Sequence, residues 1–513
     1  MRPFHFLVTV ACLTAIAGCS GASRNDPGLT SPSTPQPTNT VSGTVTFKGA
    51  ALAGVTITLW LTNSNVVVST ATTDSNGNYS FSGLSTSGNV PADYQIYANK
   101  AGYAFYPSAP SPGKVERFDH TGQFIESQTL GVAMYFTVID FVSLPNAPLA
   151  GADFTAYDGT NPLVSLAATG QTESYASGDD GALKQGAAWP ATRFTDNQDG
   201  SVTNNLTGLI WLKDAGCFAP ATWPTALADV NQLASGACGL SDGSTAGKWR
   251  LPNLNELESL IDVSSANPAL APSNRFINVG EGIYWTSTGY YGGVLGSPTA
   301  WVIRLSDGAY VNDSLQNLKA ASTNGVWAVR GPGNGAARLQ ATGLFQPPLQ
   351  TGDDGTLQMG VPLAGSRFIE NGDGTVTDAM TGLVWLKQAN CIQGDWATAV
   401  VAVTKLASGQ CGLTDGSAAG TWRMPNRKEM QSLADRNINN ESDYLNFTYL
   451  NPDHSVYQRA ILTYFVEAED YWTSSTYAAD TTEAWSVYSC DFGVYNTPKS
   501  AIQYTLAVRN ATD

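Results

Sequence analysis

Histidine is almost absent from this 513-residue chain, which has three. His5 lies near the start, and His120 and His454 lie far apart. A histidine-dependent catalytic triad or zinc site present in two copies is therefore excluded. Charged residues are also scarce at 13%, and 26 basic residues face 42 acidic ones. The formal net charge of −16 argues against nucleic acid as a partner.

Long apolar runs are missing too. The longest apolar stretch extends from Phe4 to Ala17 and is interrupted by a few polar residues. It is too short to cross a bilayer of about 30 Å as a permanent helix. Because it follows the charged Arg2, it is typical of the leader of an exported protein. We therefore expect residues 1–18 to be removed.

The leader ends in Ile16-Ala17-Gly18-Cys19, which resembles the lipobox of bacterial lipoproteins. That resemblance implies that Cys19 carries the lipid and anchors the chain in a membrane. The alternative is an ordinary secretory leader with an incidental cysteine, and both interpretations imply export. Ser20 after the cysteine favours the outer membrane, so we expect a lipid-anchored outer-membrane protein, with exposure at the cell surface left open.

Four of the seven cysteines form two pairs, Cys217/Cys238 and Cys391/Cys411, each closing a loop of about 20 residues. In an exported protein this spacing predicts two disulfides, with a metal site as the alternative. Cys490 has no evident partner and is interpreted as a buried thiol rather than a nucleophile.

Residues 19–40 are rich in Ser, Thr and Pro, which predicts a flexible tether. From 41 to 142 short runs alternate between apolar and polar residues around turns such as Asp74-Ser75-Asn76-Gly77, which predicts an all-β sandwich. The order of these runs resembles the carboxypeptidase-regulatory-like family, whose modules act as spacers.

The rest of the chain contains an internal repeat. Gly178-Asp179-Asp180-Gly181 recurs 174 residues later as Gly352-Asp353-Asp354-Gly355, and further matched strings follow at similar offsets. The copies span 165–332 and 339–511, and each is long enough to close its own core. Each copy is predicted to contain, in order, a hairpin, two helices and further strands. In the first copy the helices are expected near 225–234 and after Asn253. We expect two α+β modules.

Three repeated patterns are candidates for a site. Asn371, Asp373, Thr375 and Asp378 offer oxygen atoms to calcium, but no glutamate completes an EF-hand loop, and an Asp-Gly hairpin turn is the alternative. The spacings Asn253-x-x-Glu256 and Asn426-x-x-Glu429 predict helix capping boxes, with a ligand-binding carboxylate as the alternative.

Ten of the thirteen tryptophans form five matched pairs and are predicted to anchor the core. Trp285 and Trp472 are the best candidates for a sugar platform because polar Thr-Ser pairs follow them. The five pairs are Trp211/Trp385, Trp223/Trp396, Trp249/Trp422, Trp285/Trp472 and Trp301/Trp485.

Taken together, the strings "TGLIWLK", "WRLPNLNEL" and "YWTS" and their copies resemble the Lcl C-terminal domain family. The resemblance implies a fold related to C-type lectins and formylglycine-generating enzymes. The adhesin that names the family binds sulfated glycosaminoglycans, but this sequence has no collagen-like segment, and its negative charge opposes sulfated ligands.

We expect a surface binding protein, an adhesin or glycan binder, without catalytic activity and with an extracellular or envelope partner. No cofactor is expected, with calcium left open. A structural envelope lipoprotein is the alternative, and a formylglycine-generating type of enzyme is a further one, in which Cys490 would be the candidate nucleophile.

Overall fold

We describe the protein from a computed structural model. It describes residues 39–61, 66–84, 94–100, 103–107, 137–139, 149–150, 154–157, 163–290, 298–311, 317–331, 333–344, 350–363, 367–436, 449–450, 456–458, 462–463, 465–466 and 468–511. The leader, Cys19, nearly all of the tether and both of the remaining histidines lie outside these residues. No helix among the described residues is both long and apolar enough to cross a membrane.

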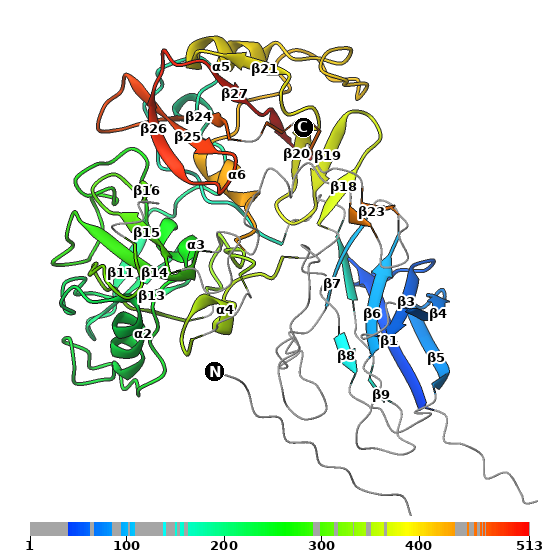
Figure 1. Cartoon of the computed structure of the whole chain (residues 1–513), viewed down its shortest axis with the longest axis horizontal. Coiled ribbons are helices and arrows are strands. Elements are labelled where there is room, and N and C mark those ends of the chain that lie inside the picture. Colours follow the sequence, from blue (N-terminus) through cyan, green and yellow to red (C-terminus); the bar gives the residue numbers. More distant parts are fainter. Residues whose placement is uncertain are drawn as a thin grey trace, which may run out of the picture.

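The N-terminal part consists of strands in two sheets, coloured blue to cyan in Figure 1. One sheet contains β2 (Ala50–Ala51), β1 (Asn39–Phe47), β10 (Phe154–Tyr157), β7 (Ala104–Pro107), β5 (Asn78–Leu84) and β9 (Leu149–Ala150). The other contains β4 (Val66–Thr72), β3 (Thr56–Leu61), β6 (Tyr94–Asn99) and β8 (Thr137–Ile139).

Alternate residues of these strands share one core. Val41 and Val45 of β1 and Ile57 and Leu59 of β3 are fully buried, as the period of two in a strand requires. The predicted limits of 41–142 need correction, because β9 and β10 pair in parallel with β1 and extend this part to Tyr157.

The described residues of module 1 (residues 194–330) form two sheets and two helices. One sheet orders β11 (Phe194–Asp196), β12 (Ser201–Asn204), β13 (Ile210–Leu212) and β17 (Val329–Arg330). The other orders β14 (Ile283–Gly289), β15 (Ala300–Arg304) and β16 (Tyr310–Val311). The helices are α2 (Trp223–Gln232) and α3 (Leu254–Glu258).

Module 2 (residues 368–510) repeats this plan. Its first sheet orders β18 (Phe368–Glu370), β19 (Thr375–Asp378), β20 (Leu383–Leu386) and β28 (Val508–Asn510). Its second orders β21 (Ile392–Gly394), β27 (Gln503–Thr505), β24 (Asp470–Thr476), β25 (Glu483–Tyr488) and β26 (Val494–Pro498), with β22 (Tyr449–Leu450) and β23 (Val456–Gln458) apart. The helices are α5 (Trp396–Thr404) and α6 (Arg427–Ser432).

The helix predicted near 225–234 is confirmed two residues earlier, as α2. Pro224 stands in its first turn, where its fixed φ favours a helix start and its missing N–H has no intrahelical acceptor to lose. Ala226, Leu227 and Val230 face the core at helical spacing. Strands outnumber helices throughout, so the modules are richer in β structure than the predicted order suggested.

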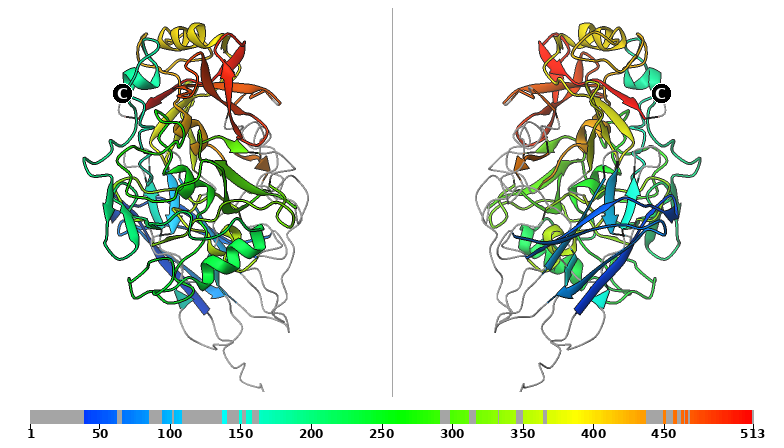
Figure 2. Two further views of the ribbon diagram at one scale, coloured as in Figure 1. Left: turned by 90° about the vertical axis from the view of Figure 1, so that its left-hand side faces the viewer. Right: turned by 90° about the vertical axis from the view of Figure 1, so that its right-hand side faces the viewer.

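One apolar core is shared between the two modules, and module 2 also contains a second core of its own around Trp396 and Trp422. A single cluster of buried apolar residues includes Trp211 and Trp301 of module 1 together with Trp385 and Trp485 of module 2. The modules lie against each other in all views (Figures 1 and 2), so each buries part of its apolar surface on the other. The expectation that each copy closes its own core therefore needs correction for the shared cluster only, because the cluster around Trp396 is built from buried residues of module 2.

Two segments that precede the modules cross from one to the other. We call residues 163–190 arm 1 and residues 337–363 arm 2; they contain the short helices α1 (Asp180–Leu183) and α4 (Asp354–Leu357). α1 packs on β24 of module 2, and α4 packs on β14 of module 1. Figure 2 shows α1, in cyan-green, at the α5 end of the molecule. The predicted limits of 165–332 and 339–511 assign each arm to the following module alone, although each arm also completes the other module.

Candidate functional site

The predicted capping boxes are present in both modules. Asn253 Oδ1 accepts from the backbone N–H of Glu256 at 2.9 Å, and Glu256 Oε2 accepts from the N–H of Asn253 at 2.9 Å. Asn426 and Glu429 repeat this arrangement at the start of α6. These carboxylates therefore cap helices, as the sequence predicted.

The same glutamates explain the arginines of the repeated motif. Arg250 binds both oxygens of Glu256, at 2.5 and 2.6 Å, and Arg423 binds both oxygens of Glu429, at 2.6 and 2.7 Å. All four side chains are almost buried. A planar, bidentate pair of this kind fixes each strand-to-helix turn and leaves little of either charge for a ligand.

Each arm inserts a buried aspartate beside the capping box of the other module. Asp180 Oδ2 accepts from Ser475 Oγ at 2.5 Å and from Thr169 Oγ1 at 2.7 Å. Asp354 Oδ2 accepts in the same way from Thr288 Oγ1 at 2.7 Å and from Thr342 Oγ1 at 2.5 Å. The repeated Gly-Asp-Asp-Gly string is thus a junction between the modules.

Burial raises the pKa of both aspartates to about 6, against the hydrogen bonds that lower it. The preceding aspartates, Asp179 and Asp353, instead cap α1 and α4 by accepting from backbone N–H groups. The four acidic residues of the two strings therefore divide into two helix caps and two buried carboxylates.

The four oxygen-bearing residues of the calcium hypothesis are engaged in local contacts. Asp378 is fully buried, and its two oxygens accept from Arg367 at 2.8 and 2.6 Å. Asp373 accepts from the N–H and hydroxyl of Thr375 in a hairpin turn, and Asn371 donates to the same hydroxyl. Among the described residues no three His, Cys, Asp or Glu side chains group as metal ligands. The geometry is that of the alternative interpretation, an Asp-Gly turn, and calcium stays untested.

The ten paired tryptophans lie in the core, each at most 2% exposed. The choice of Trp285 and Trp472 as a sugar platform needs correction, because both indoles are 0% exposed and no ring face is open to a ligand. Their Nε1 groups donate to the carbonyls of Ala221 and Gly394. The polar Thr-Ser pairs after them are buried in strands rather than exposed at a surface.

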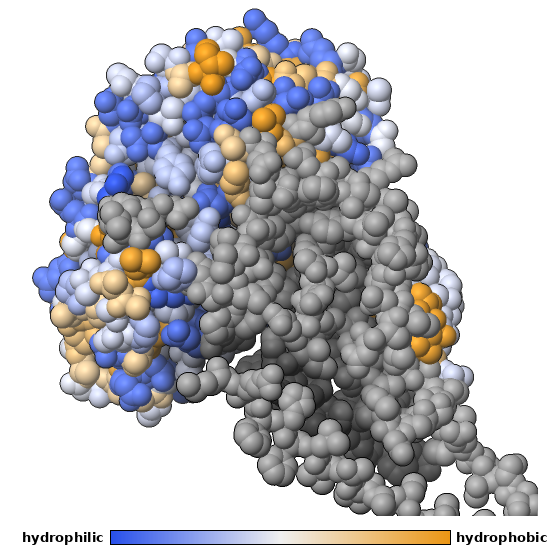
Figure 3. Space-filling model, in the orientation of Figure 1, coloured by the Kyte–Doolittle hydropathy of each residue, from blue (hydrophilic) through white to orange (hydrophobic). Residues whose placement is uncertain are grey.

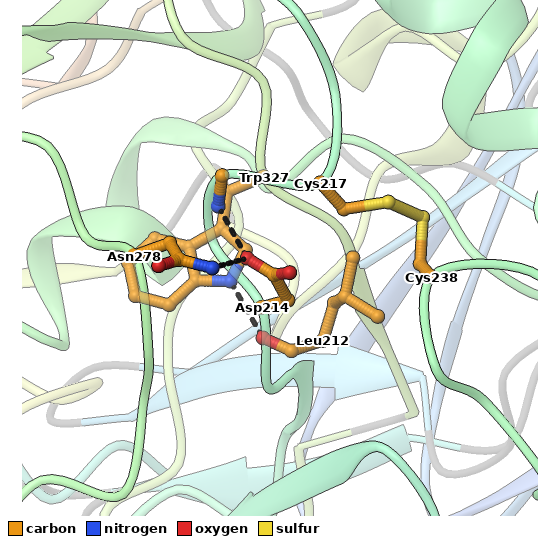
Figure 4. The surroundings of a disulfide bond; sticks show 7 residues. Leu212, Asp214, Cys217, Cys238, Asn278 and Trp327 are labelled. Carbon is orange, nitrogen blue, oxygen red and sulfur yellow. Dashed lines mark hydrogen bonds between the residues drawn. A yellow bond between two sulfur atoms is a disulfide. The ribbon is translucent and has the colours of Figure 1, made fainter.

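Both predicted disulfides are present, Cys217–Cys238 and Cys391–Cys411. Figure 4 shows the first beside Asp214, whose Oδ1 accepts from the side-chain amide of Asn278 at 2.9 Å. The bridge ties the loop after β13 to the loop after α2. Cys490 is a half-buried thiol rather than a fully buried one, and its hydrogen bond to Tyr488 raises the pKa of the tyrosine to about 12.

Sequence reasoning missed a repeated contact, in which a lysine lies over a buried tryptophan ring in both modules. Lys499 Nζ lies 4.1 Å from the ring centroid of Trp396 and 4.7 Å from that of Tyr175, which belongs to arm 1. In module 1, Lys319 Nζ lies 4.6 Å from the ring centroid of Trp223. The signal in the sequence was a lysine at the same place in both copies, in Leu318-Lys319-Ala320-Ala321 and Pro498-Lys499-Ser500-Ala501.

The environment of the two lysines is partly desolvated. Partial burial lowers the pKa of both lysines, while Asp353 and Asp179 act in the opposite direction on Lys319 and Lys499 respectively. Lys499 also donates to Thr476 Oγ1 at 2.9 Å. Tyr175 is 44% exposed and Trp396 is 2% exposed, so the tyrosine is the accessible ring beside the ammonium group. We call Lys499, Trp396 and Tyr175 the lysine–aromatic site.

The family to which the modules belong follows from comparison with known proteins. The sequence profile of the Lcl C-terminal domain matches residues 200–330 and 374–509, more than half of the chain. These segments correspond to modules 1 and 2, and both arms lie outside them. Among curated proteins, none matches this chain. On the strength of the two matched segments, this chain belongs to the Lcl C-terminal domain family.

Proposed function

We propose that this protein is an exported, lipid-anchored binding protein that takes a carbohydrate ligand at the lysine–aromatic site. The observation that carries the proposal is Tyr175, an exposed ring beside the ammonium of Lys499. Sugars bind proteins through stacking of their C–H face on aromatic rings and through hydrogen bonds to their hydroxyl groups. The site offers both.

The charge balance narrows the class of sugar. The chain carries a net charge of −16, which opposes a polyanionic ligand such as a sulfated glycan. A partly desolvated ammonium interacts more strongly with one hydroxyl or one carboxylate than a fully hydrated one does. A neutral glycan, or one with isolated carboxylates, therefore fits best.

The surface in Figure 3 also favours a polar ligand. The face shown is mainly hydrophilic over the modules, and its apolar residues are scattered rather than joined in one broad patch. A large apolar patch is the usual mark of a stable protein–protein interface. The two disulfides are typical of an oxidising compartment and support export. Lipidation of Cys19 stays a prediction, tested by palmitate labelling of the wild type and of Cys19→Ser.

The test of binding is a glycan array probed with the mature chain, with and without calcium. Lys499→Met and Tyr175→Ala should each weaken binding of the selected glycan at least tenfold. The matched control is Lys405→Met, which removes an exposed lysine at the opposite end of α5 and should leave binding unchanged.

Two results would refute the proposal. The first is the absence of binding to any glycan on the array, and the second is a selected glycan whose affinity both site variants leave unchanged. The first result would favour the structural envelope lipoprotein, for which the intertwined modules would serve as a rigid body.

A further inference from the structure

The two modules differ at the positions that face each other. The first residue of the second helix is Leu254 in module 1 and Arg427 in module 2. Four residues later stand Glu258 in module 1 and Gln431 in module 2. The repeat is thus asymmetric at its interface, with an acidic residue in one copy and a basic residue in the other.

These two different residues form a buried ion pair between the modules. Arg427 Nη2 lies 2.8 Å from Glu258 Oε2, and the two side chains are 0% and 8% exposed. The same nitrogen donates to the carbonyl of Gly308, also in module 1. The guanidinium lies 4.3 Å from the ring centroid of Trp485. The arginine therefore contacts Trp485 of its own module and Glu258 of module 1.

The neighbouring residue adds a second cation to the same face. Lys428 Nζ donates to the carbonyl of Ile261 in module 1 at 3.3 Å. The equivalent position in module 1 is Asn255, which donates instead to Gln340 of arm 2. The basic residues of this contact therefore come from module 2.

Pairing of like modules would lose these contacts. Two copies of module 1 would place each Glu258 opposite a leucine, and two copies of module 2 would place each Arg427 opposite a glutamine. A buried charge without its partner is strongly destabilising, which gives an interface specificity. Each chain has one module of each kind, so like pairing between chains would also leave modules free to join further chains.

We propose that this interface is a heterotypic recognition surface, in which the acidic face of module 1 selects the basic face of module 2 and discriminates against like modules of other chains. The partner of each module is the complementary copy, and the second helix of each module carries the selection.

The test exchanges residues between the copies in the full chain. Arg427→Leu and Glu258→Gln each introduce the residue that the other module has at that position. Each single variant should lower the urea midpoint of unfolding, because each leaves one buried charge without its ionic partner. Arg427→Leu should lower it more, since leucine offers Glu258 no hydrogen bond, whereas the amide oxygen of a glutamine at 258 can still accept from Arg427. The double variant should regain most of the loss, and Lys213→Met, which breaks a half-exposed ion pair with Asp196, should change little.

Specificity is read from the mass of the refolded protein by light scattering, at equal concentration. The double variant, which lacks the ion pair but keeps Lys428, should contain at least several-fold more dimer and higher assemblies than the wild type. The proposal fails if the two single effects add without coupling, or if the double variant refolds with the same share of monomer as the wild type. Glu258→Gln is the milder single change and serves if Arg427→Leu does not fold.

Discussion

Asp180 and Ser475 stand 295 residues apart in the chain and share a hydrogen bond of 2.5 Å inside the molecule. Asp354 of arm 2 and Thr288 of module 1 form the matching contact, with the arm and the module exchanged. The two contacts show that the arms exchange partners: each begins against its own module, as Thr169 does when its carbonyl accepts from Val263, and then reaches the other. Disruption of either arm should therefore loosen both modules together.

The pH dependence of stability should follow the two buried aspartates. Their folded pKa, about 6, lies above the ordinary value near 4, so the folded chain holds protons that the unfolded chain has released. Their favourable contribution is complete below about pH 4 and is lost as the pH rises through about 6. Each shift corresponds to on the order of 3 kcal/mol. Asp180→Asn should flatten the slope of the unfolding free energy between pH 4 and 6 in urea titrations.

A control for the pH experiment is an aspartate whose pKa is shifted in the opposite direction. Asp395 caps α5 at the surface, and the backbone N–H of Thr398 lowers its pKa. Its contribution is present at neutral pH and is lost as the pH falls through the lowered value. Asp395→Asn should therefore leave the slope between pH 4 and 6 nearly unchanged. A slope that Asp180→Asn also leaves unchanged would contradict the role assigned to the buried carboxylate.

The capping boxes should be measurable contributions to stability. Asn253→Ala and Asn426→Ala each remove the side-chain acceptor of a buried helix start, and each should cost about 1 to 2 kcal/mol of unfolding free energy. The matched control is Thr222→Ala at the start of α2, where the side chain makes no capping hydrogen bond. Equal losses at all three positions would show that capping is not the cause.

Loss of a disulfide should weaken a module through its unfolded state. The bridge Cys391–Cys411 closes a loop with a sequence separation of 20 residues. Replacing both cysteines by serine should lower the unfolding free energy by about 3 kcal/mol. The control is Cys490→Ser, which removes the free thiol and should shift the unfolding midpoint little. A Cys490→Ser variant as unstable as the double variant would show that its thiol has a structural role that the contacts described do not explain.

The contact of arm 2 with its own module should be intolerant of a side chain at Gly343. This glycine has a φ of +89°, and an added Cβ would lie 2.1 Å from Asp435 Oδ1 in module 2. Gly420 has nearly the same φ, +93°, but open space around its Cβ position. Gly343→Ala should therefore destabilise the chain more than Gly420→Ala, by about 2 kcal/mol against about 1 kcal/mol, since only the first adds a steric clash to the backbone strain. Thermal unfolding of the two variants separates these effects.

Local patterns in the sequence gave correct predictions where the cause is local. The spacing of Asn253 and Glu256 predicted a capping box because both partners lie within one turn of helix. The cysteine spacing predicted both bridges, because each pair closes a loop of about 20 residues at the same place in its copy. The prediction that Trp285 forms a sugar platform was wrong, because the Thr-Ser pair after it is polar but buried in the structure.

The sequence by itself determined the duplication, the two disulfides, the helix starts and the turns, since each depends on residues near each other in the chain. The tertiary structure decided the rest: which module receives each arm, which aspartates are buried, how Arg427 meets Glu258, and where Lys499 lies. The two copies have nearly the same sequence pattern. The local pattern alone therefore does not decide which module an arm packs against. The choice between modules depends on contacts across the interface, between residues that are distant in sequence.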